Sequence, residues 1–155
     1  FLANLKSLLA SQVTRIMHDL SRKPPESLIH LSHRAISDVL LNVKGVDYIL
    51  LCTADGFEIS SVHNKNIYNS SKLAAVSSSI VAMISAFVNE IDLKGCQSIT
   101  LDAENGKAIL NAIPNKNYPM IMVALTSKDI LLGQALFFLK KCTEDIISAD
   151  SHYSN

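Results

Sequence analysis

The stretch YILLCTADGFEISSV, residues 48–62, predicts a β-hairpin with one buried strand and one half-exposed strand. Tyr48 to Cys52 are apolar at every position, a pattern typical of a central strand that is covered on both faces. Asp55-Gly56 then indicates a two-residue turn, because glycine adopts the positive φ of such turns at little cost. The following residues alternate weakly, as in a strand nearer the sheet edge. No catalytic group accompanies this hairpin, so the rest of the chain must indicate what it serves.

The second half of the chain predicts three more strands. QSITLDA at 97–103 alternates, Asn105-Gly106 indicates another two-residue hairpin turn, and AILNAI at 108–113 follows. MIMVALT at 120–126 is apolar at all but its last position. It therefore predicts a second central strand, like the first.

Three helical patterns surround these strands, at 26–42, at about 71–91 and from 128 to about 147. Thr126 with Asp129 fits a capping box that opens the last helix. Gly133 lies inside that helix, where glycine costs roughly 1 kcal/mol against alanine, so it predicts a close approach of helix to sheet. The element order favours an α+β fold, a five-stranded antiparallel sheet with helices on both faces, plus an N-terminal amphipathic helix.

The N-terminal segment predicts a helix outside the domain proper. Its apolar residues recur at helical spacing: Leu2, Leu5, Leu9, Val13, Ile16 and Leu20. Pro24 and Pro25 end it, since proline disfavours helical geometry in the residue before it. We divide the chain into this amphipathic helix at 1–22, a linker at 23–27, a domain at 28–147 and a polar tail at 148–155. The helix is expected to dock on its own domain, on a second copy or partner, or on a membrane surface.

The helix predicted at about 71–91 has no charged face, and Ser70 or Ser71 is expected to cap it. One face is apolar: Leu73, Val76, Ile80, Ile84, Phe87 and Ile91. The other is small or lightly polar: Ala74, Ser77, Ser78, Val81, Ser85 and Val88. An ordinary surface helix carries charge on its outer side, so we expect something to cover this one. The remaining chain is short, which favours a second subunit over a larger core.

Composition excludes several classes of function. The 14 basic and 14 acidic residues balance, which argues against a nucleic-acid or anionic-membrane surface. Three cysteines without metal or redox spacing predict a reducing, cytoplasmic compartment. The charge-free apolar stretch at 73–88 is shorter than the roughly 20 residues of a bilayer span.

The sequence offers no arrangement of catalytic residues. His30 and His33 lie one helical turn apart, but a metal site needs a third or fourth ligand, so we interpret them as a solvated or interface pair. Nucleophile motifs and phosphate loops do not occur. We therefore predict no catalytic, cofactor-binding or metal-binding residues, and a binding or scaffolding protein rather than an enzyme.

The order and pattern of these elements resemble the Roadblock/dynein light chain family over residues 28–147. The residues that carry the resemblance are Gly45-Val46, Asp55-Gly56 with Ile59, and Gly133. The resemblance implies a Roadblock/profilin-like layout and a non-catalytic protein that forms homo- or heterodimers. It implies that the middle helices and the third strands of two copies pair. It also implies a small Ras-like GTPase as a partner, for which the dimer acts as regulator or scaffold.

Carried onto this sequence, the resemblance implies two sets of contact residues. The dimer interface would comprise Ala74, Ser77, Ser78, Val81, Ser85, Val88, Gln97, Ile99 and Leu101. The partner-binding residues would be Ser71, Lys72, Ala75, Ser79, Met83 and Phe87. Two alternatives remain open at this point: a small-molecule-sensing module of PAS or profilin-like layout, and a self-assembling structural scaffold.

Overall fold

The computed structural model describes residues 1–21, 23–64 and 69–153. The helices and strands follow one another in the order α1 (Leu2–Ser21), α2 (Glu26–Asn42), β1 (Val46–Thr53), β2 (Glu58–His63), α3 (Ser70–Glu90), β3 (Ser98–Ala103), β4 (Gly106–Ile113), β5 (Met120–Thr126) and α4 (Leu132–Ser151).

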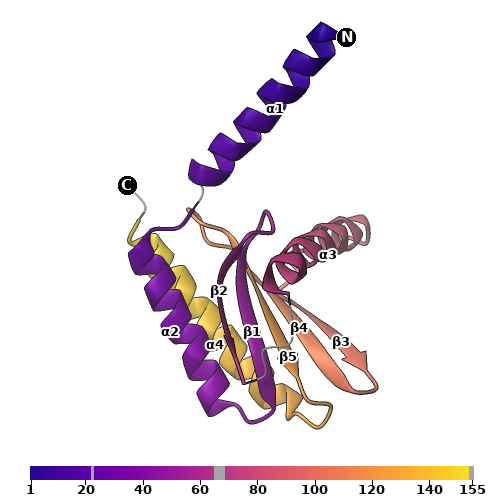
Figure 1. Cartoon of the computed structure of the whole chain (residues 1–155). Coiled ribbons are helices and arrows are strands. Elements are labelled where there is room, and N and C mark those ends of the chain that lie inside the picture. Colours follow the sequence, from indigo (N-terminus) through magenta and orange to yellow (C-terminus); the bar gives the residue numbers. More distant parts are fainter. Residues whose placement is uncertain (22, 65–68, 154–155) are drawn as a thin grey trace.

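The five strands form one antiparallel sheet in the order β2-β1-β5-β4-β3. The two strands predicted to be central, β1 and β5, lie side by side, and β2 and β3 form the two edges. α2 and α4 lie together on one face of the sheet, and α3 lies on the other (Figure 1). The predicted fold class is therefore confirmed, including the helices on both faces.

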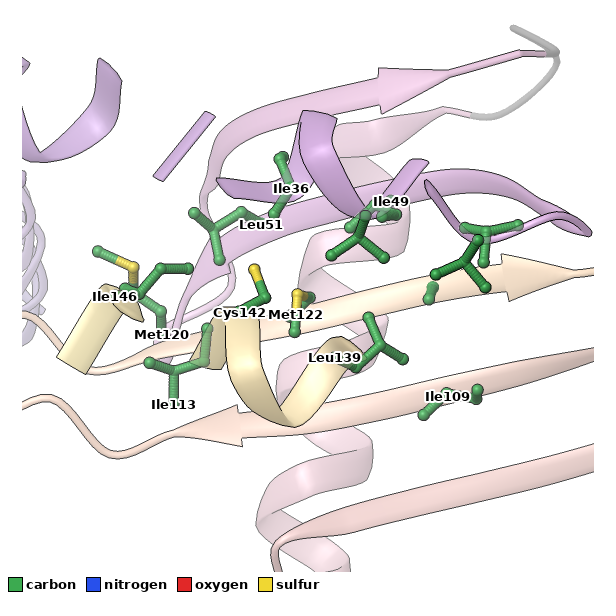
Figure 2. Close-up of a cluster of buried hydrophobic side chains, with 14 of the residues drawn as sticks. Ile36, Ile49, Leu51, Ile109, Ile113, Met120, Met122, Leu139, Cys142 and Ile146 are labelled. Carbon is green, nitrogen blue, oxygen red and sulfur yellow. The ribbon is translucent and has the colours of Figure 1, made fainter. Parts of the chain in front are cut away.

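Alternate residues of β1 serve two separate cores. Ile49 and Leu51 join the larger cluster, between the sheet and the α2–α4 pair, where Leu139 and Ile146 of α4 meet them (Figure 2). Tyr48, Leu50 and Cys52 point to the opposite face and join the smaller cluster beneath α3. All five of these β1 residues are fully buried, which confirms that the strand is covered on both sides.

The two hairpins differ in detail from their predictions. Thr53 N–H donates to the carbonyl oxygen of Phe57, so Ala54 to Gly56 form a three-residue loop in place of a two-residue turn. Gly56 does take positive φ, at 95°, at the last position of this loop, where a glycine closes a type of bulge common in hairpins. In the second hairpin Ala103 pairs with Gly106, so the turn is Glu104-Asn105.

Gly106 thus begins β4, and its role is steric. A Cβ placed there would lie 2.7 Å from the carbonyl oxygen of Thr126 on β5. The glycine lets the two backbones approach, and it does not supply a positive φ. The Asn105-Gly106 pattern correctly predicted a hairpin, but Gly106 is required for close packing on β5 and not for a positive φ in the turn.

The last helix begins later than predicted. α4 starts at Leu132 after the N-cap Leu131, with no side-chain cap hydrogen bond, so the capping box from Thr126 and Asp129 is wrong. Thr126 belongs to β5 instead. A Cβ added at Gly133 would meet no atom of the rest of the protein within 4 Å, which contradicts the expected close approach to the sheet.

α4 also extends to Ser151, into the segment predicted to be a polar tail. Asp150 is buried there and accepts hydrogen bonds from the backbone N–H groups of Asn117 and Tyr118, each at 3.0 Å. A carboxylate that satisfies two loop amides ties the end of the helix to the β4–β5 connection. The last helix therefore ends later than the sequence analysis expected, beyond residue 147.

α1 projects away from the sheet (Figure 1). Its side chains from Phe1 to Val13 are exposed, so over that part of the helix the expected docking on its own domain is wrong. Ile16 and Leu20 lie outside the described side chains. The amphipathic pattern of α1 is left for a second copy, a partner or a membrane surface.

Candidate functional site: one face of helix α3 and the edge of strand β3

Hydrogen bonds to β1 and to the β1–β2 loop hold the first half of α3. Asn69 caps the helix through its side-chain oxygen, which accepts from the Lys72 N–H at 3.1 Å, so the expected cap at Ser70 or Ser71 is wrong. The Tyr48 hydroxyl of β1 is hydrogen-bonded to Ser70. Ser78 Oγ donates to the Ala54 carbonyl oxygen at 2.6 Å. These contacts fix both the position of α3 and its rotation about its own axis.

Gly56 is the point of closest packing between hairpin and helix. A Cβ at this position would lie 3.1 Å from Ala75 Cα and 3.2 Å from Ser78 Cβ. Contacts this short are tighter than normal van der Waals packing, so only glycine admits the helix at this distance. The glycine of the hairpin signal therefore serves the turn and the seating of α3 at the same time.

The residues of α3 that are fully buried are small. Ala74 and Ser77 lie against the sheet, while Leu73, Ile80 and Val81 are partly buried at the edge of the smaller core. In an α-helix successive residues are rotated by about 100°, so Ser71 and Ser78 share a flank. That flank faces β2 and the β1–β2 loop, since Ser71 Oγ lies 3.5 Å from a Glu58 oxygen and Ser78 bonds to Ala54.

The opposite flank of α3 is apolar and exposed. Val76, Met83 and Phe87 follow one another at helical spacing and are 48%, 65% and 60% exposed. Since the Ser71–Ser78 flank faces β2, this one is directed toward the β3 side of the sheet. Leu101 of β3 is 49% exposed, and Ile91 and Leu93 after the helix are exposed as well. We call Val76, Met83, Phe87 and Leu101 the apolar flank.

A third face of α3 points away from the sheet and consists mostly of small residues. Lys72, Ala75 and Ser79 lie there and are exposed, as are Ala82 and Ala86 further along. Between Lys72 and Glu90 the helix carries no charge. We call Lys72, Ala75, Ser79, Ala82 and Ala86 the outer row.

The predicted dimer residues of α3 lie mainly where the helix already has a neighbour. Ala74 and Ser77 are buried by this chain's own sheet and offer no surface to another molecule, which corrects that part of the prediction. Ser78 and Val81 are partly covered, as is Val88, while Ser85 is exposed. The physical reason is that small residues suit close packing on a sheet as well as close packing between subunits. The sequence could not tell the two uses apart.

The strand residues of the predicted interface lie on a free edge. β3 pairs with β4 on one side only and is the last strand of the sheet. Leu101 is exposed and Ile99 partly so, while Gln97 lies just before the strand, which begins at Ser98. An unpaired edge offers backbone N–H and C=O groups to an added strand.

The predicted partner-binding residues are all accessible. Ser71, Lys72, Ala75, Ser79, Met83 and Phe87 are exposed. The structure divides them among three faces, however: Ser71 on the flank toward β2, three residues in the outer row, and Met83 with Phe87 on the apolar flank. Val76 completes the apolar flank, and its place in the apolar periodicity of α3 was the signal that could have identified it.

No group of three His, Cys, Asp or Glu residues in the described part of the chain is placed to hold a metal ion. His33 is hydrogen-bonded to Ser60, and His30 lies 4.0 Å from Glu26. Burial raises the pKa of the Cys52 and Cys142 thiols to about 12, so both are unreactive at neutral pH.

α3 is also the one helix in the described ranges that is long and apolar enough to cross a membrane. This resemblance to a membrane-spanning helix rests on length and composition alone. In the structure the helix packs through Ala74 and Ser77 on the sheet, as a part of the folded domain. The apolar character of its remaining surface therefore requires another explanation.

Comparison with known proteins places the fold in a family. Residues 35–124 match the Roadblock/LC7 domain. The chain belongs to the Roadblock/LC7 family. This confirms the resemblance drawn from the hairpin, the uncharged helix and the strand order. None of the curated proteins matches the chain.

Solved structures with this fold include several Roadblock/LC7 proteins. An MglB with a tetrameric arrangement superposes with a TM-score of 0.75 at 14% identity, over 85% of this chain and 96% of its own. The gliding protein MglB of Thermus thermophilus superposes with a TM-score of 0.73 at 13% identity, over 85% of this chain and 97% of its own. A Roadblock/LC7 domain of Streptomyces avermitilis superposes with a TM-score of 0.64 at 11% identity, over 74% of this chain and 92% of its own. At these identities the likeness shows the fold alone.

The packing of Gly56 against α3 predicts a difference between two glycine substitutions. Gly56→Ala and Gly95→Ala both place alanine at positive φ, but nothing lies within 4 Å of a Cβ at Gly95. Gly95→Ala should lower the free energy of unfolding by about 1–2 kcal/mol from backbone strain. Gly56→Ala should lower it by at least about 1 kcal/mol more, because α3 must also move. Urea unfolding of both variants measures this, and equal losses would mean that Gly56 does not seat the helix.

Proposed function

We propose that this Roadblock/LC7 protein is a non-catalytic, cytoplasmic homodimer that binds a small Ras-like GTPase as its regulator or scaffold. The observation that carries the proposal is the uncovered surface of α3, apolar on the flank toward β3 and uncharged on its outer row. Soluble proteins rarely leave a contiguous apolar surface of this kind without a partner.

The apolar flank fits contact with a second copy. Two α3 helices placed side by side would bury Val76, Met83 and Phe87 against the same residues of the other copy, as a two-fold interface requires. The same arrangement would bring the β3 edges of the two copies together, so that their sheets join and both exposed edges disappear. This version of the interface keeps the strand residues Gln97, Ile99 and Leu101 from the sequence prediction. It replaces the six predicted residues of α3, Ser85 among them, by Val76, Met83 and Phe87 of the apolar flank.

The outer row would then form a platform across both copies. Its small side chains, Ala75, Ser79, Ala82 and Ala86, permit a partner to approach the helix backbones closely. A platform of paired helices is what the family resemblance implies for GTPase binding. The tetrameric arrangement of an MglB with this fold supports self-association here. The exposed apolar side chains of α1 offer a further contact for a larger assembly.

Charge placed on the apolar flank should dissociate the dimer. Phe87→Glu and Met83→Glu each add a carboxylate to a surface that the second copy would bury, at a cost of several kcal/mol if it stays ionised. We expect light scattering to give a dimer mass for the wild-type chain and a monomer mass for both variants, with unchanged circular dichroism. Ser85→Glu is the matched control, since it places the same charge on the other side of α3. A monomeric wild-type chain would reject the proposed interface.

A substitution in the outer row should weaken GTPase binding while the chain stays folded and dimeric. The immobilised full chain is incubated with lysate of its source cell in GDP or a non-hydrolysable GTP analogue, and retained GTPases are identified by mass spectrometry. We expect one small GTPase to be retained in only one nucleotide state. Ser79→Glu should keep the dimer mass and reduce this retention at least about tenfold, the effect of roughly 1.4 kcal/mol. No GTPase on an intact wild-type dimer in either nucleotide state would contradict the regulator role and favour a self-assembling scaffold.

A further inference from the structure

The apolar side of α1 is uncovered over the first thirteen residues of the chain. Six large apolar side chains there are at least 46% exposed: Phe1, Leu2, Leu5, Leu8, Leu9 and Val13. Successive residues of a helix are rotated by about 100°, so these side chains occupy a stripe about 140° wide. Packing of such a stripe normally supplies most of a helix's stability. We call these six residues the α1 stripe, and it needs a surface to cover it.

The linker between α1 and α2 determines where α1 leaves the domain. It consists of residues 22–25 and includes Pro24 and Pro25, whose rings restrict the backbone. Pro24 is buried beside Thr53 at the end of β1 and Pro119 in the β4–β5 connection. α1 therefore leaves at one end of the sheet, next to the start of α2 (Figure 1).

The side of α1 opposite the stripe carries no charge over the same residues. It consists of small or amide side chains such as Asn4, Ser7 and Ser11, and Lys6 at the border of the stripe is the one charged side chain in residues 1–13. Helices that pair as coiled coils carry Glu and Lys beside the seam, and helices that bind anionic membranes are rich in Lys and Arg. A wide apolar stripe with an uncharged opposite side fits neutral lipid instead, where apolar side chains insert at packing defects.

Two further apolar side chains point outward from the domain itself. Leu41 of α2 is 81% exposed and Phe137 of α4 is 65% exposed. Leu41 lies two residues after the buried Val39, and Phe137 lies two residues from the buried Ala135 and Leu139. Two residues correspond to a rotation of about 200°, so Leu41 and Phe137 point away from the sheet. The face formed by α2 and α4 thus has exposed apolar side chains at the end of α2 that is remote from α1.

From these features we propose that α1 binds the surface of a neutral, loosely packed lipid bilayer, with the α2–α4 face turned toward the lipid. The α1 stripe inserts about 5–10 Å, to the boundary of headgroups and acyl chains. Leu41 and Phe137 contact the same surface at the other end of α2. A membrane is favoured over a second α1 because the helix lacks the flanking charges by which paired helices select each other.

The position of the bilayer relative to the GTPase platform rests on the proposed homodimer. Two sheets that join through their β3 edges, with both α3 helices on the same face, are related by a two-fold axis perpendicular to the sheet. This rotation keeps both α2–α4 pairs on the other face and puts the two α1 helices at opposite ends of the joined sheet. One bilayer can therefore bind both α1 helices while the α3 platform faces away from it. Two linked anchors bind more tightly than one.

Flotation of the full chain with lipid vesicles measures this binding. We expect the wild-type chain to float with sonicated dioleoylphosphatidylcholine vesicles of about 30 nm diameter at about 1 mM lipid. Extruded vesicles of about 200 nm have fewer packing defects, so they should bind at least about fivefold less protein. Replacement of about a third of the lipid by phosphatidylserine should change the bound fraction less than about twofold, because Lys6 alone supplies charge beside the stripe.

Paired substitutions locate the contact. Leu9→Glu should lower the bound fraction at least about tenfold, whereas Ser7→Glu adds the same charge about 200° away and should leave binding unchanged. Phe137→Glu should lower it about threefold, and Ser85→Glu on α3 should not. Leu9→Glu should keep the dimer mass and GTPase retention of the wild type, since it lies outside the α3 surfaces.

Phe87→Glu separates this proposal from the proposed function. As a monomer with one α1 it should float at least about tenfold less than the wild type. If the wild-type chain is not a dimer, the two should float equally, and Leu9→Glu should still lose binding in either background. The membrane contact of α1 then stands although the dimer fails.

Several results would overturn the proposal. These are no flotation of the wild type with the small neutral vesicles, or equal flotation of Leu9→Glu and Ser7→Glu. Flotation that requires phosphatidylserine and disappears at about 0.5 M salt would show electrostatic attachment instead. A wild-type mass above the dimer that Leu9→Glu returns to the dimer, without flotation, would show that a second copy covers the stripe. Unchanged flotation of Phe137→Glu would overturn the orientation of the α2–α4 face.

Discussion

The close packing of α3 on the sheet through small side chains is the contact that decides what this chain presents to other molecules. Ala74 and Ser77 lie directly on the sheet, and Gly56 admits the helix where any Cβ would collide with Ala75. Hydrogen bonds from Ser78 and Tyr48 prevent the helix from rotating. Because the small residues are turned inward, the larger apolar side chains lie at the edge of the core, as Leu73 and Ile80 do, or outside it. The exposed Met83 and Phe87 are thus a consequence of how the helix is seated.

The edge strand next to this flank also favours contact with a partner. β3 has one free edge, and Leu101 on it is exposed. An exposed strand edge that carries a hydrophobic side chain is a template for pairing with another chain, and natural sheets usually protect such edges with charge, proline or short strands. β3 has Asp102, which is paired with Lys107 of the neighbouring strand across the hairpin. A second copy that covers the flank and extends the sheet would bury the apolar side chains and pair the free edge of β3 in one interface.

Much of this architecture follows from local patterns in the sequence. The unbroken apolar runs of β1 and β5 predicted central strands because residues on both faces need cover. The uncharged helix predicted a surface that something else covers, because the outer face of an ordinary surface helix carries charge. Details that depend on neighbouring backbones were not predictable: Gly106 is required by the Thr126 carbonyl, which is distant in sequence, and Gly133 has no close neighbour at all. The two faces of α3 were confused because neither carries charge.

The central claim is that the α3 flank and the β3 edge are covered by a second copy in solution, and backbone amide exchange at β3 tests it most directly. In an antiparallel strand alternate N–H groups point to opposite sides, so half of those in β3 bond to β4 and the rest face the free edge. The account predicts that NMR-detected hydrogen exchange is slow for both sets in the assembled chain, and fast for the outward set in the monomeric Phe87→Glu variant. Fast exchange of the outward set in the wild-type chain, with the inward set still protected, would show that the edge is free and would contradict the account.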